Sequence, residues 1–384
     1  MRFSTLLNQP ADWMDHSGPH SDIVITSRIR LARNIRGAEF PGWATKDTRL
    51  ALLAEVLPAV EALPEMKSGF AQGFEKLTAI QKQVLVERHL ISREIAARSA
   101  GSAVVMNRRQ TLSFMINEED HLRMQSIRPG LDLAAAYEAA DNADTALEET
   151  LDFAFDADLG YLTACPTNLG TAMRASAMLH LPGLVLGDQM SQTIQAVNKI
   201  GLAVRGIYGE GTESLANLFQ ISNQHTLGER EGDIIVRLTK VIEQIIHHEG
   251  NARAKLLEER PAMLEDQICR AYAILRHARI IASKEAMNLL SMVRLGADLG
   301  MLPQESGPLM DKLLLEIQPA HLQIGVRSKL SAEDRDLLRA QTLRESLQDL
   351  AEPKPLETPD DGEVGEEDDP EGGEAGSESG GGSL

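Results

Sequence analysis

Apolar positions in the first 250 residues switch repeatedly between two periods, one of about two residues and one of about 3.6 residues. The runs 103–106 and 111–116 alternate around the turn 107–110, which predicts a β-hairpin. Segments with helical spacing lie between such runs, at 46–63, 79–99, 131–155, 187–200 and 232–250. This order predicts an α+β fold in which helices flank an antiparallel β-sheet.

Only helical spacing is found from residue 251, where Leu264, Ile268 and Leu275 recur on one helix face. A serine before an acidic turn predicts a last helix over 331–350. The remaining residues are mostly Gly, Glu, Asp, Pro and Ser, a composition typical of disorder. We therefore predict three parts: an α+β domain over 1–250, an all-α domain over 251–350 and a disordered acidic tail over 351–384.

Composition narrows the classes of protein that fit. The net charge is −19, but the tail holds twelve acids and one Lys and so accounts for −11 of it. An acidic chain is a poor general binder of nucleic acid, whereas local groups of arginine would suit a small polyanion. Two cysteines exclude a disulfide framework and a thiolate-rich zinc site. Without an apolar run of about 20 residues or a signal peptide, we expect a cytoplasmic protein and no membrane contact.

The segment 114–127 carries three consecutive acids, Glu118, Glu119 and Asp120, between two strand-like runs, and Arg123 follows them. Such a turn is either a charged hairpin tip or a set of carboxylates directed into a cleft at the end of a sheet. Earlier in the chain, Arg28 and Arg30 would project to one side of a strand. They form either a solvated basic edge or a site for a phosphate chain, which guanidinium groups bind well.

Two later segments combine glycine with charge. In 160–184 a strand ends at Cys165, and Gly170 opens a predicted helix that contains Arg174, which would place an anion site at the helix start. Cys165 is either a buried structural thiol or a thiol of lowered pKa. Arg205 ends a strand before a glycine-rich loop around Glu210. His89, in the helix predicted over 79–99, is either a helix-terminus residue or a ligand contact.

Arginines at strand ends and carboxylates in turns are the two components that phosphoryl transfer requires. The chain lacks the GxxxxGK[ST] loop, the HRD and DFG motifs and the HExxH motif, so its scaffold differs from those classes. Two separate carboxylates suit a guanidinium acceptor, because they can hold two of its edges while one of them removes a proton.

Four segments resemble the signature blocks of the phosphagen (guanidino) kinase family in order and spacing, namely TSRIRLARN, NEEDHLRMQS, CPTNLGTAMRAS and VRGIYGEGTES. The resemblance implies that ATP is bound, with Mg²⁺, by Arg28, Arg30, Arg123, Arg174, Arg205 and His89. It implies that Glu119 and Glu210 hold the guanidino group as catalytic residues, and that Cys165 lines the guanidino pocket.

Two departures indicate a subfamily. The first arginine block starts at residue 26, whereas small-molecule members carry a helical domain ahead of it. The segment 335–340, RDLLRA, is similar to a motif of bacterial protein arginine kinases. The resemblance implies that Arg335, Asp336, Arg339 and Ala340 form a regulatory phosphoarginine site. It also implies that the helical domain mediates homodimer formation. The alternative is an ordinary charged helix face.

These observations predict an ATP-dependent kinase that phosphorylates exposed arginine residues of proteins. The resemblance further implies that the phosphorylated proteins are marked for Clp-type proteolysis and that an activator protein and Clp components are partners. Two alternatives remain at this stage. One is a phosphagen kinase acting on a free guanidino metabolite, and the other is a phosphoarginine-binding adaptor whose kinase site is idle.

Overall fold

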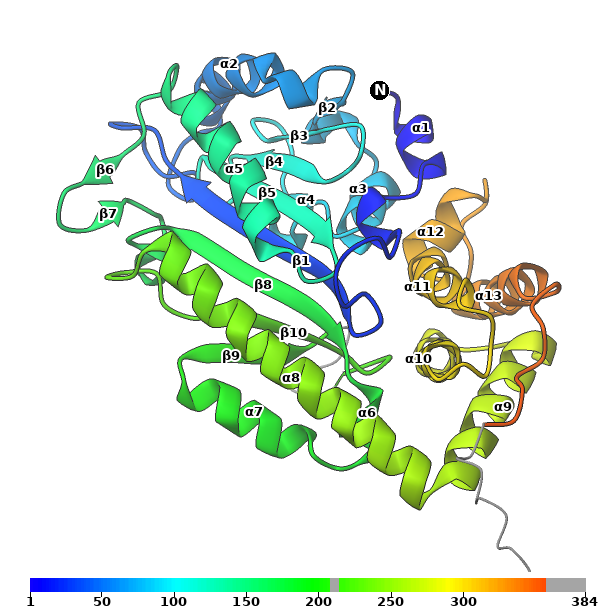
Figure 1. Cartoon of the computed structure of the whole chain (residues 1–384). Coiled ribbons are helices and arrows are strands. Elements are labelled where there is room, and N and C mark those ends of the chain that lie inside the picture. The colour runs from blue at the N-terminus through cyan, green and yellow to red at the C-terminus, as the bar shows by residue number, and fades with distance from the viewer. Residues whose placement is uncertain (208–213, 357–384) are drawn as a thin grey trace, which may run out of the picture.

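The computed structural model describes residues 1–207 and 214–356. Glu210 and nearly all of the predicted acidic tail lie outside these residues. None of the helices within them combines the length and the apolar character that crossing a membrane requires. The expected α+β fold with a separate helical part is confirmed, and Figure 1 shows the two parts side by side.

An eight-stranded sheet forms the centre of the first part, and every strand in it pairs with its neighbours in antiparallel fashion. From one edge to the other, its strands are β2 (Phe70–Gly73), β3 (Ala103–Met106), β4 (Leu112–Ile116), β5 (Leu122–Pro129), β1 (Val24–Arg33), β8 (Met173–His180), β10 (Leu218–Asn223) and β9 (Leu202–Gly206). A small hairpin of β6 (Phe155–Asp156) and β7 (Gly160–Tyr161) projects beside it. The predicted hairpin over 103–116 is confirmed as β3 and β4.

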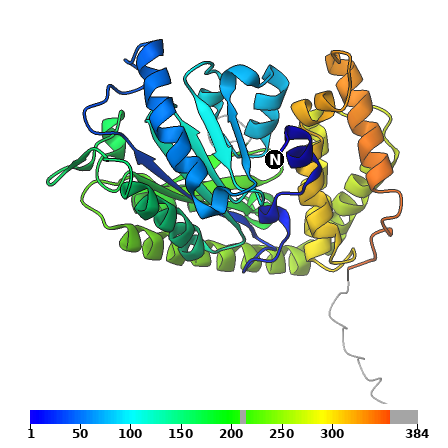
Figure 2. The ribbon, with the colours of Figure 1, turned by 90° about the horizontal axis from the view of Figure 1, so that it is seen from above.

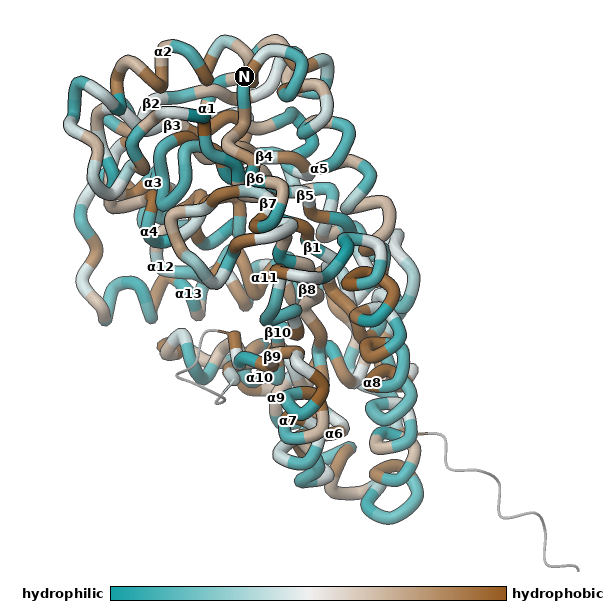
Figure 3. The backbone as a smooth tube through the Cα atoms, turned by 90° about the vertical axis from the view of Figure 1, so that its left-hand side faces the viewer, coloured by the Kyte–Doolittle hydropathy of each residue, from teal (hydrophilic) through white to brown (hydrophobic). Residues whose placement is uncertain are grey.

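One face of the sheet is covered by α2 (Lys46–Ala62), α5 (Leu133–Glu148) and α8 (Glu231–Glu259), and α7 (Met190–Lys199) packs against β9 (Figures 1 and 2). Apolar and polar residues alternate along α8 in Figure 3, because only one side of this helix meets the sheet. Ile29, Met124 and Ala175 point into the core between these helices and the sheet. Their strand neighbours therefore face the opposite side of the sheet.

The shorter helices and turns of the first part connect the strands. They are α1 (Phe3–Asn8), η1 (Asp12–Met14), η2 (Pro64–Met66), η3 (Phe74–Lys76), α3 (Ala79–Glu87), α4 (Arg93–Ala96), η4 (Pro166–Asn168) and α6 (Pro182–Leu186).

The second part consists of α9 (Pro261–His277), α10 (Ser283–Asp298), α11 (Ser306–Glu316), α12 (Pro319–Ile324) and α13 (Ala332–Ser346). The predicted serine cap is confirmed, because Ser331 and Asp334 form a reciprocal capping box at the start of α13. The helix α8 runs without a break through residue 250 to Glu259, so the predicted boundary between the domains falls inside one continuous helix.

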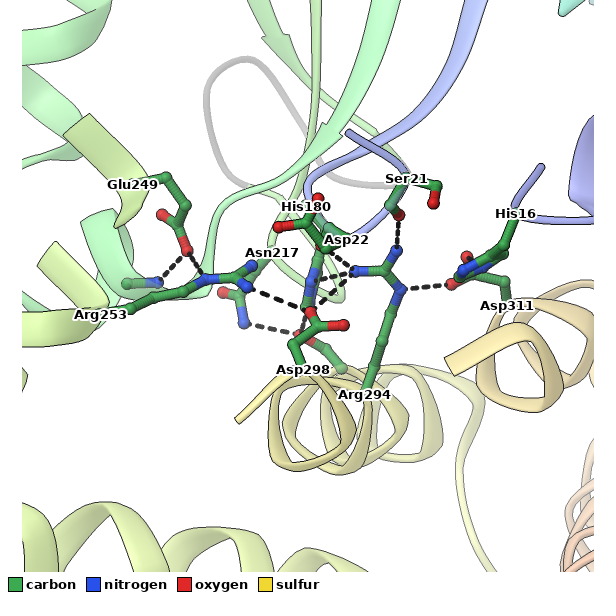
Figure 4. A network of polar contacts seen from close by, with 12 residues as sticks. His16, Ser21, Asp22, His180, Asn217, Glu249, Arg253, Arg294, Asp298 and Asp311 are labelled. Atoms are coloured by element: carbon green, nitrogen blue, oxygen red, sulfur yellow. Dashed lines mark hydrogen bonds and ion pairs between the residues drawn. The ribbon is translucent and has the colours of Figure 1, made fainter. Parts of the chain in front are cut away.

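A buried network of polar contacts joins the two parts around Arg294 of α10 (Figure 4). A second contact lies at α12, where the carboxylate of Glu87 accepts hydrogen bonds from the backbone N–H groups of Ala320, at 2.9 Å, and His321, at 3.1 Å. Arg88 then donates to backbone carbonyls of the N-terminal segment, those of Leu6, Leu7 and Gln9. The helical part is therefore fastened directly to the part that carries the sheet.

Two helix predictions were wrong, and the strand predicted to end at Cys165 ends as β7 at Tyr161. The helix predicted over 79–99 is broken into α3 and α4, because His89 adopts a positive φ of 57° between them. The helix predicted to open at Gly170 is the strand β8, so Arg174 lies on the sheet and not in a helical turn. In both of these segments the local sequence pattern is typical of a helix, but contacts with distant parts of the chain determine the structure.

Candidate active site

A cavity of about 860 Å³ opens on the face of the sheet opposite α2, α5 and α8. Arg30 of β1 pairs in register with Arg174 of β8 on one side and with Gln125 of β5 on the other. Arg123 lies two pairs further along the ladder of β1 and β5, opposite Ala32 and on the same face of β5 as Gln125. Three neighbouring strands therefore bring together arginines that are far apart in the sequence, and Arg30, Arg123 and Arg174 all line the cavity.

Positive charge in this cluster is poorly compensated. Burial lowers the pKa of Arg28 to about 10, and repulsion from Arg174 and Arg123 adds to the effect. The pKa of Arg30 is lowered well below its usual value, first by burial and then by the neighbouring arginines. Within the part of the chain that the structure describes, the buried Nε atoms of Arg30 and Arg174 have no hydrogen-bond partner. Such an arrangement favours a bound polyanion that supplies the missing charge and acceptors.

The three carboxylates of the acidic turn after β4 have different environments. Glu118 is buried, lies 2.6 Å from Nη1 of Arg123 and accepts a hydrogen bond from the hydroxyl of Ser92. Asp120 is also buried and accepts from Asn34 Nδ2, at 2.7 Å, and from the backbone N–H of Ala164, at 2.8 Å. Glu119 remains 46% exposed at the cavity, 3.1 Å from Nη2 of Arg123. Of the three, Glu119 is the carboxylate that an incoming ligand can reach.

A narrower pocket continues from the arginine cluster toward the N-terminal segment. Its wall includes His89, Trp13 and Arg28, and the guanidinium of Arg28 donates to Gln220 Oε1 at 2.7 Å. The rings of Trp13 and His89 meet edge to face with their centroids 6.0 Å apart. The carbonyl of His89 accepts from Gln125 Nε2 at 2.7 Å, which fixes the loop between α3 and α4 against the sheet. This small, aromatic and mostly apolar pocket thus borders the arginine cluster at Arg28.

We expect His89 to make the protein less stable as the pH falls below neutrality. Burial, followed by repulsion from Arg28 and Arg93, lowers the pKa of His89 to about 4. In the unfolded chain the group titrates near its ordinary pKa of about 6.5. Between these values the unfolded state binds more protons, so stability is lost as the pH falls from about 6.5 toward 4. Thermal unfolding of the parent and of His89→Asn should show a shallower loss for the variant, and equal slopes would contradict this assignment.

Other predicted site residues lie nearer the edges of this arrangement. Cys165 is partly exposed, with its Sγ 3.0 Å from Thr167 Oγ1, and its neighbours Ala164 and Asn168 line the cavity. Arg205 is exposed on β9, opposite Gln220 of β10, and its charge contributes to the lowered pKa of Arg174. Glu210 lies outside the described residues, so the structure leaves its predicted role untested.

The RDLLRA segment on α13 lies in the helical part, apart from this cavity. Arg339 is buried and donates to the carbonyls of Ile317, at 3.1 Å, and Ile281, at 2.9 Å, and it pairs with Asp336. Arg335 is partly exposed and donates to the carbonyl of Leu330 at 3.0 Å, whereas Ala340 is buried. Arg339 thus ties α13 to the end of α11 and to the connection between α9 and α10, and Arg335 is the guanidinium that solvent reaches.

Sequence reasoning missed several residues that shape the cavity. Arg98 donates to the carbonyl of Glu118 at 3.0 Å, and Ser92 caps α4 while holding the carboxylate of Glu118. Gln125 and Gln220 contact His89 and Arg28. Gln125 could have been found from the sequence, because its spacing of two residues from Arg123 places both side chains on one face of β5.

Comparisons with known proteins find related sequences and a related fold. A family model described as ATP:guanido phosphotransferase, C-terminal catalytic domain, matches residues 54–252, and one described as protein-arginine kinase McsB C-terminal domain matches residues 261–358. A protein-arginine kinase of Moorella thermoacetica is 46% identical over 347 residues, which cover 89% of this chain and 98% of that protein. One of Brevibacillus brevis is 46% identical over 342 residues, covering 88% and 96%. The crystal structure of a lombricine kinase is 27% identical with a TM-score of 0.55, covering 64% of this chain and 73% of that one.

Proposed function

The chain belongs to the ATP:guanido phosphotransferase family, among its protein-arginine kinases, and on this basis we propose how it phosphorylates arginine residues of proteins. The γ-phosphoryl group of ATP is transferred to a guanidino nitrogen of the target arginine. The observation that carries this proposal is the cluster of buried, poorly compensated arginines beside one exposed carboxylate.

We assign the phosphates of ATP to the arginine cluster. Guanidinium groups donate several hydrogen bonds in a plane, so arginines on adjacent strands can hold successive phosphates. Burial and then mutual repulsion lower the pKa values of Arg28, Arg30 and Arg174, and bound phosphates would offset both effects. The cluster comprises Arg28, Arg30, Arg123, Arg174 and Arg205, with His89 beside the nucleoside.

We assign the acceptor arginine to the end of the cavity where Glu119 is exposed. A guanidinium is protonated at neutral pH, so its nitrogen becomes nucleophilic only as a proton leaves. Glu119 takes this proton as the N–P bond forms and the bond between the γ-phosphorus and the bridging oxygen breaks, releasing ADP. Glu210 is proposed as a second clamp on the guanidino group, and Cys165 as part of the wall of its pocket.

Mg²⁺ would accompany ATP. Among residues 1–207 and 214–356, no group of three or more acidic, histidine or cysteine side chains could hold a metal ion, and the cavity is lined by the arginines Arg30, Arg98, Arg123 and Arg174. These side chains fit a nucleotide whose own phosphates and water supply the Mg²⁺ ligands. When bound, the ion would offset charge on the phosphates.

Partners and regulation are proposed from the same membership. The substrates are proteins with an exposed arginine, and their phosphorylation would mark them for Clp-type proteolysis, with an activator protein as a further partner. The helical part would mediate a homodimer and bind phosphoarginine through Arg335, Asp336, Arg339 and Ala340. In that role Arg335 would meet the phosphoryl group, since Arg339 already donates to carbonyls inside the helical part.

Mass spectrometry under non-acidic conditions tests the proposed reaction, because phosphoarginine is labile in acid. After incubation with Mg²⁺-ATP, an arginine-containing protein should carry phosphoarginine, and a protein with its arginines replaced by lysine should not. Turnover of free arginine or creatine without phosphorylation of the protein would instead identify a metabolite kinase. Binding of phosphoarginine without any consumption of ATP would identify an adaptor.

A further inference from the structure

An exposed tryptophan stands at the mouth of the cavity. Trp43 is 79% exposed, whereas the only other tryptophan of the chain, Trp13, is buried. Phe40, Gly42 and Trp43 line the same cavity as Glu119 and Arg123. An indole in water leaves a large apolar surface unburied, and tryptophan is enriched at the centres of protein interfaces.

The turn that presents Trp43 is held firmly in place. The backbone N–H groups of Trp43 and Ala44 both donate to the carbonyl of Phe40, at 2.9 and 3.0 Å. The Phe40 ring meets Trp43 edge to face at 5.9 Å and stacks on His121 at 6.4 Å. His121 is itself fixed between the N–H of Ile35, at 3.0 Å, and the carbonyl of Glu39, at 2.8 Å. The exposed indole of Trp43 is thus supported by Phe40, and Phe40 is supported by His121, which directly follows the acidic turn.

The strand register places Trp43 at the acceptor end of the cavity. Along β1, Arg28 pairs opposite Ile127, Arg30 opposite Gln125 and Ala32 opposite Arg123. Moving toward the end of β1 therefore leads away from the pocket of His89 and toward the acidic turn. The turn with Phe40 and Trp43 follows the end of β1, so it borders the side where Glu119 is exposed.

The chemistry of this rim suits a polypeptide better than a nucleotide. An apolar indole stands with the exposed carboxylates of Glu119 and Glu94 around the same opening. Carboxylates repel phosphate, but they attract the positive charge of arginine-bearing segments. An indole face also packs against aliphatic side chains and against a neighbouring guanidinium.

We infer that Trp43, supported by Phe40 and His121, is a docking platform for the polypeptide segment that carries the target arginine. The inference rests on the proposed function and adds a contact for the residues beside that arginine. The platform affects the binding of protein substrates and not the binding of ATP.

Tryptophan fluorescence tests binding directly, because Trp43 is the tryptophan that a solvent quencher reaches. The probe is a short synthetic peptide with one arginine between leucine residues. Adding this peptide to the full-length protein should shift the emission to the blue and reduce quenching by acrylamide, whereas ATP alone should not. Unchanged quenching at saturating peptide would overturn the inference.

Kinetics of Trp43→Ala provide the second test. The KM for the peptide should rise roughly tenfold, while the KM for ATP and the melting temperature stay the same. Val236→Ala, which removes an apolar side chain that is 69% exposed on α8, should change none of these values. An unchanged peptide KM in Trp43→Ala would refute the platform and leave the kinase assignment intact. Failure of the parent protein to phosphorylate any arginine would instead refute the proposed function.

Discussion

Replacing Glu119 with glutamine is expected to lower kcat for arginine phosphorylation by about 10²–10⁴ without unfolding the protein. The substitution keeps the shape of the side chain and removes its ability to accept a proton. The side chain of Glu119 is about half exposed, so its ion pair with Arg123 contributes about 1 kcal/mol or less to stability. Rates with an arginine-containing peptide at saturating ATP, together with a thermal melt, measure both effects.

Two matched variants separate the proton-accepting role of Glu119 from a general effect of charge. Glu118→Gln alters a buried carboxylate that orients Arg123, so we expect it to raise the KM for ATP and to reduce kcat less. Glu138→Gln removes an exposed carboxylate on α5, on the far side of the sheet, and should leave activity unchanged. If Glu119→Gln still phosphorylated the peptide at the parent rate, Glu119 would not be the base.

Much of the fold was predictable because local patterns and tertiary structure agree. The hairpin of β3 and β4 follows from alternation around a turn, and the cap of α13 follows from serine and aspartate three residues apart. A helix was wrongly predicted around Arg174, because Gly170 and Thr171 resemble a helix start. The residues that follow them instead pair with β1 and β10. Pairing between distant strands leaves no local signal in that segment.

The site was predictable to a similar degree. Alternation in a strand was enough to place Arg28 and Arg30 on one face, and the acidic turn indicated carboxylates at the end of a sheet. The different environments of Glu118 and Glu119 could not be predicted, because they depend on where Ser92 arrives from another helix. The platform of Trp43 was missed for the same reason, since its support by His121 joins residues far apart in the chain.

Replacing Arg294 with methionine is expected to destabilise the protein by roughly 3–5 kcal/mol, because it removes the buried cation shared by Asp311 and Asp298, which leaves them only His16 and Arg253 as basic partners. The Arg294 side chain is fully buried between the two parts of the molecule (Figure 4). Its Nε donates to Asp311 at 2.8 Å, and Nη1 lies 2.8 Å from Nδ1 of His180 and 3.4 Å from Asp298. It also donates to the carbonyls of Ser21 and Asp22, both at 2.9 Å.

The pKa of His180 depends on its contact with Arg294. Burial and then the charge of Arg294 hold that pKa well below its usual 6.5, so the ring is neutral and can accept from the guanidinium. A methionine would fill part of the volume of Arg294 but cannot donate a hydrogen bond. The His180 ring, the Asp311 carboxylate and the carbonyls of Ser21 and Asp22 would therefore each lose a donor.

Urea unfolding of Arg294→Met should be compared with that of Arg270→Met. Arg270 also forms an ion pair on a helix of the second part, with Asp266, but its side chain is 74% exposed. An exposed pair contributes at most about 1 kcal/mol, so this control should unfold near the parent midpoint. Equal midpoints for the two variants would show that the Arg294 network does not stabilise the junction. A large loss confined to Arg294→Met would show that the two parts of the molecule depend on one buried cation.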